Sequence, residues 1–135
     1  MQMVPRFAPG FRISTLDVLI LIVGSAAAIG LALEVWWWGY IVAMVVGHFF
    51  LFCNVFRISR ILELAWAAAF IGLAGGTIAA NWPSWTATTV AALFITTTLI
   101  AVEVCRPSYH GVGWERINPN LKAWWEANHG LPSHQ

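Results

Sequence analysis

The chain has 135 residues, of which 59% are hydrophobic and 10% charged, and its net charge at pH 7 is +1. Soluble domains are nearer half apolar and a quarter charged, so a water-soluble fold would have to expose a large apolar surface. This excludes an ordinary soluble domain. The nearly neutral charge provides no general basic field, and we expect no nucleic-acid partner.

Residues 1–15 form an N-terminal segment ahead of the first apolar run. Ser14 or Thr15 is expected to cap the helix that follows, with Asp17 in its first turn near the positive end of the helix dipole. The apolar run is longer than the core of a signal peptide and has no cleavage site before a polar segment. The pattern therefore predicts a helix that is retained.

Four apolar runs follow one another, at about residues 16–35, 40–56, 61–80 and 86–104. A helix of about 20 residues spans the ~30 Å hydrocarbon core, and the runs are too long and too apolar for barrel strands. Pro83 suits the first turn of the fourth helix. The connections are short, so consecutive helices must be antiparallel. We therefore predict an all-α, polytopic membrane protein with an up-down-up-down bundle over residues 16–104.

All seven Lys and Arg residues fall on one side of this arrangement. The predicted turns at 36–39 and 81–85 have none and are rich in tryptophan, as membrane interfaces are. Cytoplasmic loops collect positive charge, so we expect a multi-pass protein of the inner membrane with both termini in the cytoplasm. The seven residues are Arg6, Arg12, Arg57, Arg60, Arg106, Arg116 and Lys122.

Residues 105–135 form a cytoplasmic tail with a loop and then a short amphipathic helix at about 119–129. Asn118 is expected to cap this helix, with Pro119 at its first position and Gly130 as its stop.

One side of this tail helix is aromatic, because Leu121, Trp124 and Trp125 share it. Such a surface can dock on a partner protein or lie on the membrane surface, and the sequence does not separate the two.

His48 lies near the middle of the second run, where an ionisable side chain costs free energy unless it has a partner. It can ligate a metal, a haem or a chlorin, relay protons, or make a structural hydrogen bond to a threonine hydroxyl or a backbone carbonyl. No other histidine lies in a span, so haem or chlorin binding would need a ligand from a partner chain. Cys53 and Cys105 match no metal-site spacing, and we predict two reduced thiols and no metal site.

The third run has four small residues at a spacing of four: Ala68, Gly72, Gly76 and Ala80. Such a ridge lets another helix backbone approach closely, and we predict a packing surface here. The first run has a shorter version at Gly24–Ala28 and Ala26–Gly30. We expect one ridge to lie inside the bundle and the other to remain free for another protein.

Motifs for nucleophilic, nucleotide-dependent or metal-dependent chemistry are absent from the sequence, so we predict no enzyme. Surplus packing surface favours a non-catalytic accessory subunit of a larger membrane complex, and respiratory or photosynthetic complexes are suitable hosts. The expected partners are other integral membrane subunits and the lipid bilayer. One alternative is a small oligomeric transporter or channel, and another is a cofactor binder that uses His48 with ligands from a partner.

Overall fold

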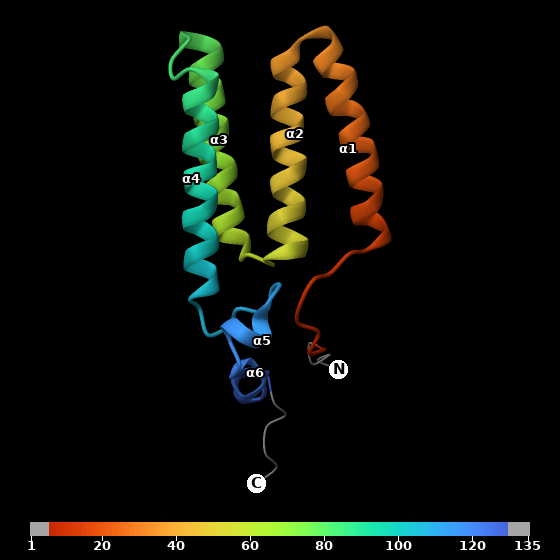
Figure 1. Cartoon of the computed structure of the whole chain (residues 1–135), viewed down its shortest axis with the longest axis vertical. Coiled ribbons are helices and arrows are strands. Elements are labelled where there is room, and N and C mark those ends of the chain that lie inside the picture. Colours follow the sequence, from red (N-terminus) through yellow and green to blue (C-terminus); the bar gives the residue numbers. More distant parts are fainter. Residues whose placement is uncertain (1–5, 130–135) are drawn as a thin grey trace.

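The computed structural model describes residues 6–129, and within this range the chain is helical without a strand. Four long helices dominate it (Figure 1): α1 (Thr15–Glu34), α2 (Trp36–Phe50), α3 (Arg60–Ala80) and α4 (Trp85–Val104). A π-helix, η1 (Leu51–Val55), continues α2. Each of the four segments is long and apolar enough to cross a membrane, which confirms the predicted all-α four-span bundle.

The two ends of the bundle differ in chemistry. One end, here called the arginine end, holds Arg12, Arg57, Arg60 and Arg106, together with the described residues before α1 and after α4. The opposite end, the tryptophan end, holds the α1–α2 and α3–α4 connections with Trp36, Trp37, Trp38, Trp82 and Trp85. This segregation is what a multi-pass membrane protein requires, because tryptophan and arginine both favour interfaces over the apolar interior.

The α1–α2 connection is shorter than the sequence indicated. Residues 36–39 were expected to be a turn, but α1 ends at Glu34 and α2 begins at Trp36, leaving only the extended Val35 between them. Gly39 makes this possible, because a Cβ there would collide with the Ala28 carbonyl oxygen and the Ala32 side chain. The missing side chain lets the two backbones meet at the start of the hairpin.

The first residues of α1 and α4 are set by the serines that cap them. Ser14 caps α1 as predicted, and its hydroxyl and backbone amide both donate to the Asp17 carboxylate in a capping box. The prediction for Pro83 was wrong by two positions, because Ser84 is the N-cap of α4 and Pro83 lies before it.

The helices are arranged as two antiparallel hairpins that lie side by side (Figure 1). In one, α1 packs along α2. In the other, α3 packs on α4, while α2 and α3 approach each other at only a few positions. The buried core lies between α2, α3 and α4 and is centred on Phe52, Trp66, Phe70, Ala74 and Ala92.

Two short helices lie beyond α4 at the arginine end: α5 (Trp114–Ile117) and α6 (Leu121–His129). The predicted tail helix is therefore present, but it begins at Leu121 instead of 119. Asn118 does not cap it with its side chain, which donates instead to the carbonyl oxygens of Pro107 and Tyr109 at 2.7 and 3.1 Å. Gly130, the predicted stop, lies outside the described residues.

Candidate functional site

His48 is buried where α2, α3 and α4 meet, with 7% of its surface exposed. Its ring stacks on Trp66, with centroids 4.0 Å apart and planes 16° apart. The Nδ1 atom lies 2.8 Å from the Met44 carbonyl oxygen, and Nε2 lies 2.9 Å from the Thr96 hydroxyl. Of the roles that the sequence left open, the structure shows the hydrogen bonds to a backbone carbonyl and a threonine hydroxyl.

These contacts assign the proton of a neutral ring. A carbonyl oxygen can only accept, so Nδ1 of His48 donates to Met44 and Nε2 is left as an acceptor. The Thr96 hydroxyl accepts from Trp66 Nε1 at 2.9 Å, and its single hydrogen has two acceptors, His48 Nε2 and the Ala92 carbonyl. Thr96 is therefore the one hydroxyl that joins α2, α3 and α4.

A second polar bond joins α2 to α4 nearer the tryptophan end. The Thr89 hydroxyl donates to the Trp85 carbonyl, so the Tyr40 hydroxyl donates to Thr89 at 2.6 Å. Tyr40 lies two turns before His48 on α2, and Thr89 lies two turns before Thr96 on α4, so the parallel helices are joined twice in register. Lipid provides no hydrophobic force between helices, and such bonds help to hold the two hairpins together.

Both ring nitrogens of His48 already make contacts, and this counts against a ligand role for the side chain. A haem, chlorin or metal would have to replace either the Met44 or the Thr96 contact. Among the described residues, no group of three His, Cys, Asp or Glu side chains could hold a metal ion. Cys53 and Cys105 are both free thiols, as predicted, and the Cys53 thiol donates to Glu63 at 3.6 Å.

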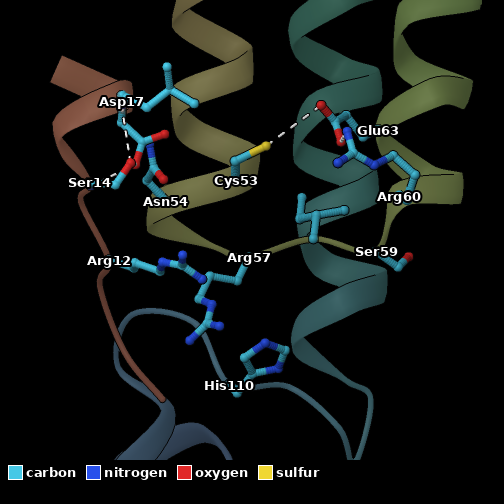
Figure 2. Close-up of a pocket in the computed structure, with 12 residues that line it drawn as sticks. Arg12, Ser14, Asp17, Cys53, Asn54, Arg57, Ser59, Arg60, Glu63 and His110 are labelled. Carbon is cyan, nitrogen blue, oxygen red and sulfur yellow. Dashed lines mark hydrogen bonds and ion pairs between the residues drawn. The ribbon is translucent and has the colours of Figure 1, made fainter. Parts of the chain in front are cut away.

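A polar pocket of about 520 Å³ lies at the arginine end, and the sequence analysis did not anticipate it (Figure 2). Four separate parts of the chain form its walls: the segment before α1, the end of η1, the start of α3 and the loop after α4. Its arginines are Arg12, Arg57 and Arg60, and His110 lies on the side of the loop. Only the fold brings these residues together.

The carboxylates of the pocket have partners of their own. Asp17 accepts from the Ser14 amide and hydroxyl at 2.7 and 2.6 Å, and Glu63 pairs with Arg60 at 2.9 Å. Within the described range, Arg12 and Arg57 have no carboxylate within ion-pair distance. The pocket therefore has two guanidinium groups that make no direct ion pair, and the Asp17 carboxylate attracts Arg12 from a greater distance.

Arg57 is held in an unusual backbone conformation at the exit of η1. Its φ of 51° lies in the left-handed region, which is uncommon for a residue other than glycine. Its guanidinium donates to the Ala8 carbonyl oxygen of the N-terminal segment. Partial burial, and then the neighbouring positive charge of Arg12, lower the pKa of Arg57. Burial disfavours the charged guanidinium, and a second cation beside it acts in the same direction.

Asn54 adds an unsatisfied donor to the same pocket. Only 3% of its surface is exposed, and its side-chain Nδ2 has no hydrogen-bond partner in the described part of the chain. The Asn54 carbonyl accepts from the Arg12 amide at 3.1 Å, which ties the N-terminal segment to η1. A buried donor without a partner costs about 1–3 kcal/mol, so the amide is suited to bind something that enters the pocket.

The predicted small-residue ridge of α3 points away from the bundle. Ala68, Gly72 and Ala80 are exposed, and a Cβ at Gly72 would meet nothing within 4 Å. A Cβ at Gly76 would lie near the Trp82 backbone and the Pro83 ring of the following turn, and not near another helix. Trp66 and Phe70 form the inward side of α3 instead. The ridge thus has no helix neighbour among the described residues.

The shorter ridge of α1 is the one inside the bundle. Ala28 is buried, and a Cβ at Gly24 would lie 2.7 Å from the Val46 side chain of α2. The other half of this ridge, Ala26 and Gly30, is exposed, and a Cβ at Gly30 would meet nothing within 4 Å, so only Gly24 and Ala28 pack inside. That the α3 ridge contacts another protein stays a prediction.

The aromatic side of the tail helix packs largely within the chain. Leu121 is completely buried, and Trp125 packs edge-on against Phe7, with ring centroids 5.7 Å apart. Trp124 remains partly exposed. The sequence did not identify Tyr109, whose buried hydroxyl donates to the Val112 carbonyl at 2.7 Å. A contact between this side of α6 and a partner remains a prediction, and Trp124 is its most available residue.

Comparisons with family models, with curated proteins and with solved structures find no match for this chain. The fold and the geometry of its sites are therefore the basis for a functional proposal.

Proposed function

We propose that this chain is a non-catalytic subunit of a larger membrane complex, and that a transmembrane helix of a partner packs beside α2. The observation that carries the proposal is Gly47. It lies in mid-span on α2, and a Cβ there would meet nothing within 4 Å. An open glycine backbone in lipid is a surface that another helix can approach closely.

Two apolar grooves run along α2, and Gly47 lines both. The groove between α2 and α4 has a volume of about 370 Å³ and reaches His48 and Thr96 at its base. The groove between α1 and α2, of about 300 Å³, passes Gly24 and Ala28. A neighbouring helix in either groove would bury apolar surface that the bundle leaves open.

The proposal includes an orientation: the chain lies in an inner membrane with its arginine end in the cytoplasm. The positive-inside pattern supports this orientation. The tail then presents Trp124 to cytoplasmic parts of the complex. The threonines of α4 give less support to the alternative of a channel. Thr97 and Thr98 donate to the carbonyls of Leu93 and Phe94 in their own helix, so these hydroxyls need no water-filled path.

The test is purification of the native protein in a mild detergent, with the bound subunits identified and their ratio measured. We expect other integral membrane proteins at a fixed ratio to this chain. Gly47→Leu places a branched side chain on the surface that both grooves share and should release these subunits, while the thermal stability of the chain itself is unchanged. Gly30→Leu is the matched control, because Gly30 on α1 is equally open but lines neither groove.

Four results would contradict the proposal. Purification of the chain alone, or retention of every partner by Gly47→Leu, would exclude packing beside α2. A homo-oligomer without other subunits would favour a transporter or channel. A Soret or chlorin absorption band lost on His48→Gln would favour cofactor binding instead.

A further inference from the structure

The polar pocket at the arginine end has a distribution of charge that favours an anion. Of its three arginines, only Arg60 has a carboxylate partner, and that partner is Glu63. Arg12 and Arg57 face the same space without one among the described residues. Figure 2 shows their side chains close together below η1, with His110 beneath them. Two unpaired guanidinium groups in one pocket attract a ligand that can accept hydrogen bonds from both.

The helix dipoles reinforce this preference. The N-termini of α1 and α3, helices of 20 and 21 residues, both lie at the pocket, where Ser14 and Ser59 are among its lining residues. Backbone N–H groups at a helix N-terminus favour negative charge. Carboxylates already meet one N–H group at each terminus, because Asp17 accepts from the Ser14 amide and Glu103 accepts from the Ser59 amide at 3.4 Å. The N–H groups that remain in the first turns are the ones that can favour an anion in the pocket.

Asn54 points independently to a ligand. Its Nδ2 is buried, makes no hydrogen bond of normal geometry within residues 6–129 and lies beside the Asp17 carboxylate, and the residue lines the pocket between Asp17 and Arg57 (Figure 2). An acceptor oxygen in the pocket would satisfy this donor together with the two guanidinium groups. A phosphate group has several strong acceptor oxygens and can serve all three.

The position of the pocket indicates where the phosphate comes from. Arg12 lies three residues before α1, and Arg57 lies between η1 and α3, so both are at the ends of the spans. This is the depth at which lipid headgroups lie. Basic pockets there bind anionic headgroups. The volume of about 520 Å³ has room for a phosphate with a small polar headgroup.

We propose that the pocket binds the phosphate of an anionic lipid headgroup, held by Arg12, Arg57 and the Asn54 amide. The site goes beyond the proposed subunit function and does not depend on it, because every group that binds the phosphate belongs to this chain. Free phosphate compounds share the chemistry, and the experiment separates them from lipid.

The experiment uses the full chain in detergent micelles with added phosphatidylglycerol, phosphatidylcholine or inorganic phosphate. Native mass spectrometry measures the affinity for lipid, and the melting temperature follows each addition. We expect phosphatidylglycerol to bind and to raise the melting temperature, because a ligand that binds only the folded state stabilises it. Phosphatidylcholine, whose phosphate is offset by its choline charge, should bind far more weakly.

Single variants test the residues. Arg12→Gln and Arg57→Gln should each weaken phosphatidylglycerol binding about tenfold or more, because each removes one charge-assisted hydrogen bond. Arg12 is the cleaner position, since its side chain is exposed and makes no bond that holds the fold among the described residues. Asn54→Ala should weaken binding without a change in net charge. Arg116→Gln is the matched control, because Arg116 is exposed and lies outside the pocket.

Each remaining outcome contradicts the proposal. Equal weakening by Arg116→Gln would mean a diffuse attraction of lipid to positive charge instead of a site. Unchanged binding by Arg12→Gln and Asn54→Ala would exclude this pocket. Tight binding of inorganic phosphate with no preference for phosphatidylglycerol would assign the pocket to a soluble phosphate compound.

Discussion

His48 and Trp66 stack face to face in the middle of the bundle, with ring centroids 4.0 Å apart, and both contact the Thr96 hydroxyl through a ring nitrogen. Each of the three residues comes from a different helix. Flat stacking gives the pair dispersion contact, and the shared hydroxyl fixes the rotation of both rings. This arrangement determines how the α1–α2 hairpin sits against the α3–α4 hairpin.

Replacement of Thr96 by valine should loosen the contact between the hairpins. Valine has a similar shape but no hydroxyl, so His48 Nε2 loses its partner, while Trp66 Nε1 retains the Ala92 carbonyl at 3.4 Å. We expect a loss of about 1–3 kcal/mol in unfolding free energy. Thr97→Val is the control, because the exposed Thr97 bonds only to Leu93 of its own helix. Equal effects in reversible detergent unfolding would show that the Thr96 contacts add nothing.

Substitution of Gly39 should damage the fold much more than substitution of Gly72. A leucine at Gly39 has to displace the Ala28 carbonyl and Ala32, and both belong to the backbone-to-backbone contact of α1 and α2. We expect a loss of several kcal/mol, as for overpacked sites at close helix contacts. Gly72→Leu enters open space and should leave monomer stability unchanged. A destabilised Gly72→Leu monomer would mean that the α3 ridge packs against something within the chain.

Accessibility labelling should locate the arginine end in the cytoplasm. Cys105 is exposed at this end, and Trp82, with 77% of its surface exposed, lies at the other. In intact cells, an impermeant maleimide should label Trp82→Cys in a Cys105→Ser background. The native Cys105 should react only after the membrane is permeabilised. The reverse labelling pattern would invert the orientation.

Loss of Trp125 should release the N-terminal segment from the tail. Trp125 packs on Phe7 at 5.7 Å and stacks on His129 at 4.3 Å, so Trp125→Ala leaves a void between residues 6–10 and α6. We expect faster protease cleavage of the N-terminal segment, with the four spans intact. Trp124→Ala should leave the cleavage rate unchanged, because Trp124 has no ring contact with Phe7. Faster cleavage in both variants would mean that α6 as a whole, and not the Trp125 contact, protects the segment.

The burial of Tyr109 predicts how this end responds to alkali. Burial, and then the nearby Glu103 carboxylate, raise the pKa of Tyr109 above its ordinary value of 10.0. The folded state therefore holds the phenol proton more tightly than the unfolded state does. Stability should fall as the pH rises above 10.0, where only the unfolded state releases the proton readily. Tyr109→Phe should remove this fall, which can be followed as unfolding free energy against pH.

The α1–α2 hairpin shows why sequence boundaries were imperfect. The tryptophans at 36–38 are typical of an interface, and the sequence therefore predicted a turn there. In the structure these tryptophans lie at the interface and also form the first turn of α2. This is possible because Gly39 permits α2 to begin immediately after Val35. Whether a glycine serves as a turn or as a close contact depends on which backbone faces it, and the sequence does not contain that information.

The length and apolar character of the four runs, the Ser14 cap and the segregation of arginine from tryptophan determined the number of spans and their alternation. These properties are local, because the cost of placing a backbone or a charge in lipid depends on each segment by itself. The tertiary structure alone decided that His48 meets Thr96, that the α3 ridge points outward, and that Arg12, Arg57 and Asn54 line one pocket. Those relationships join residues more than 40 positions apart, as His48 with Thr96 and Arg12 with Asn54, or set the rotation of a helix about its axis. They depend on how the helices pack, which apolar runs of nearly uniform composition do not specify.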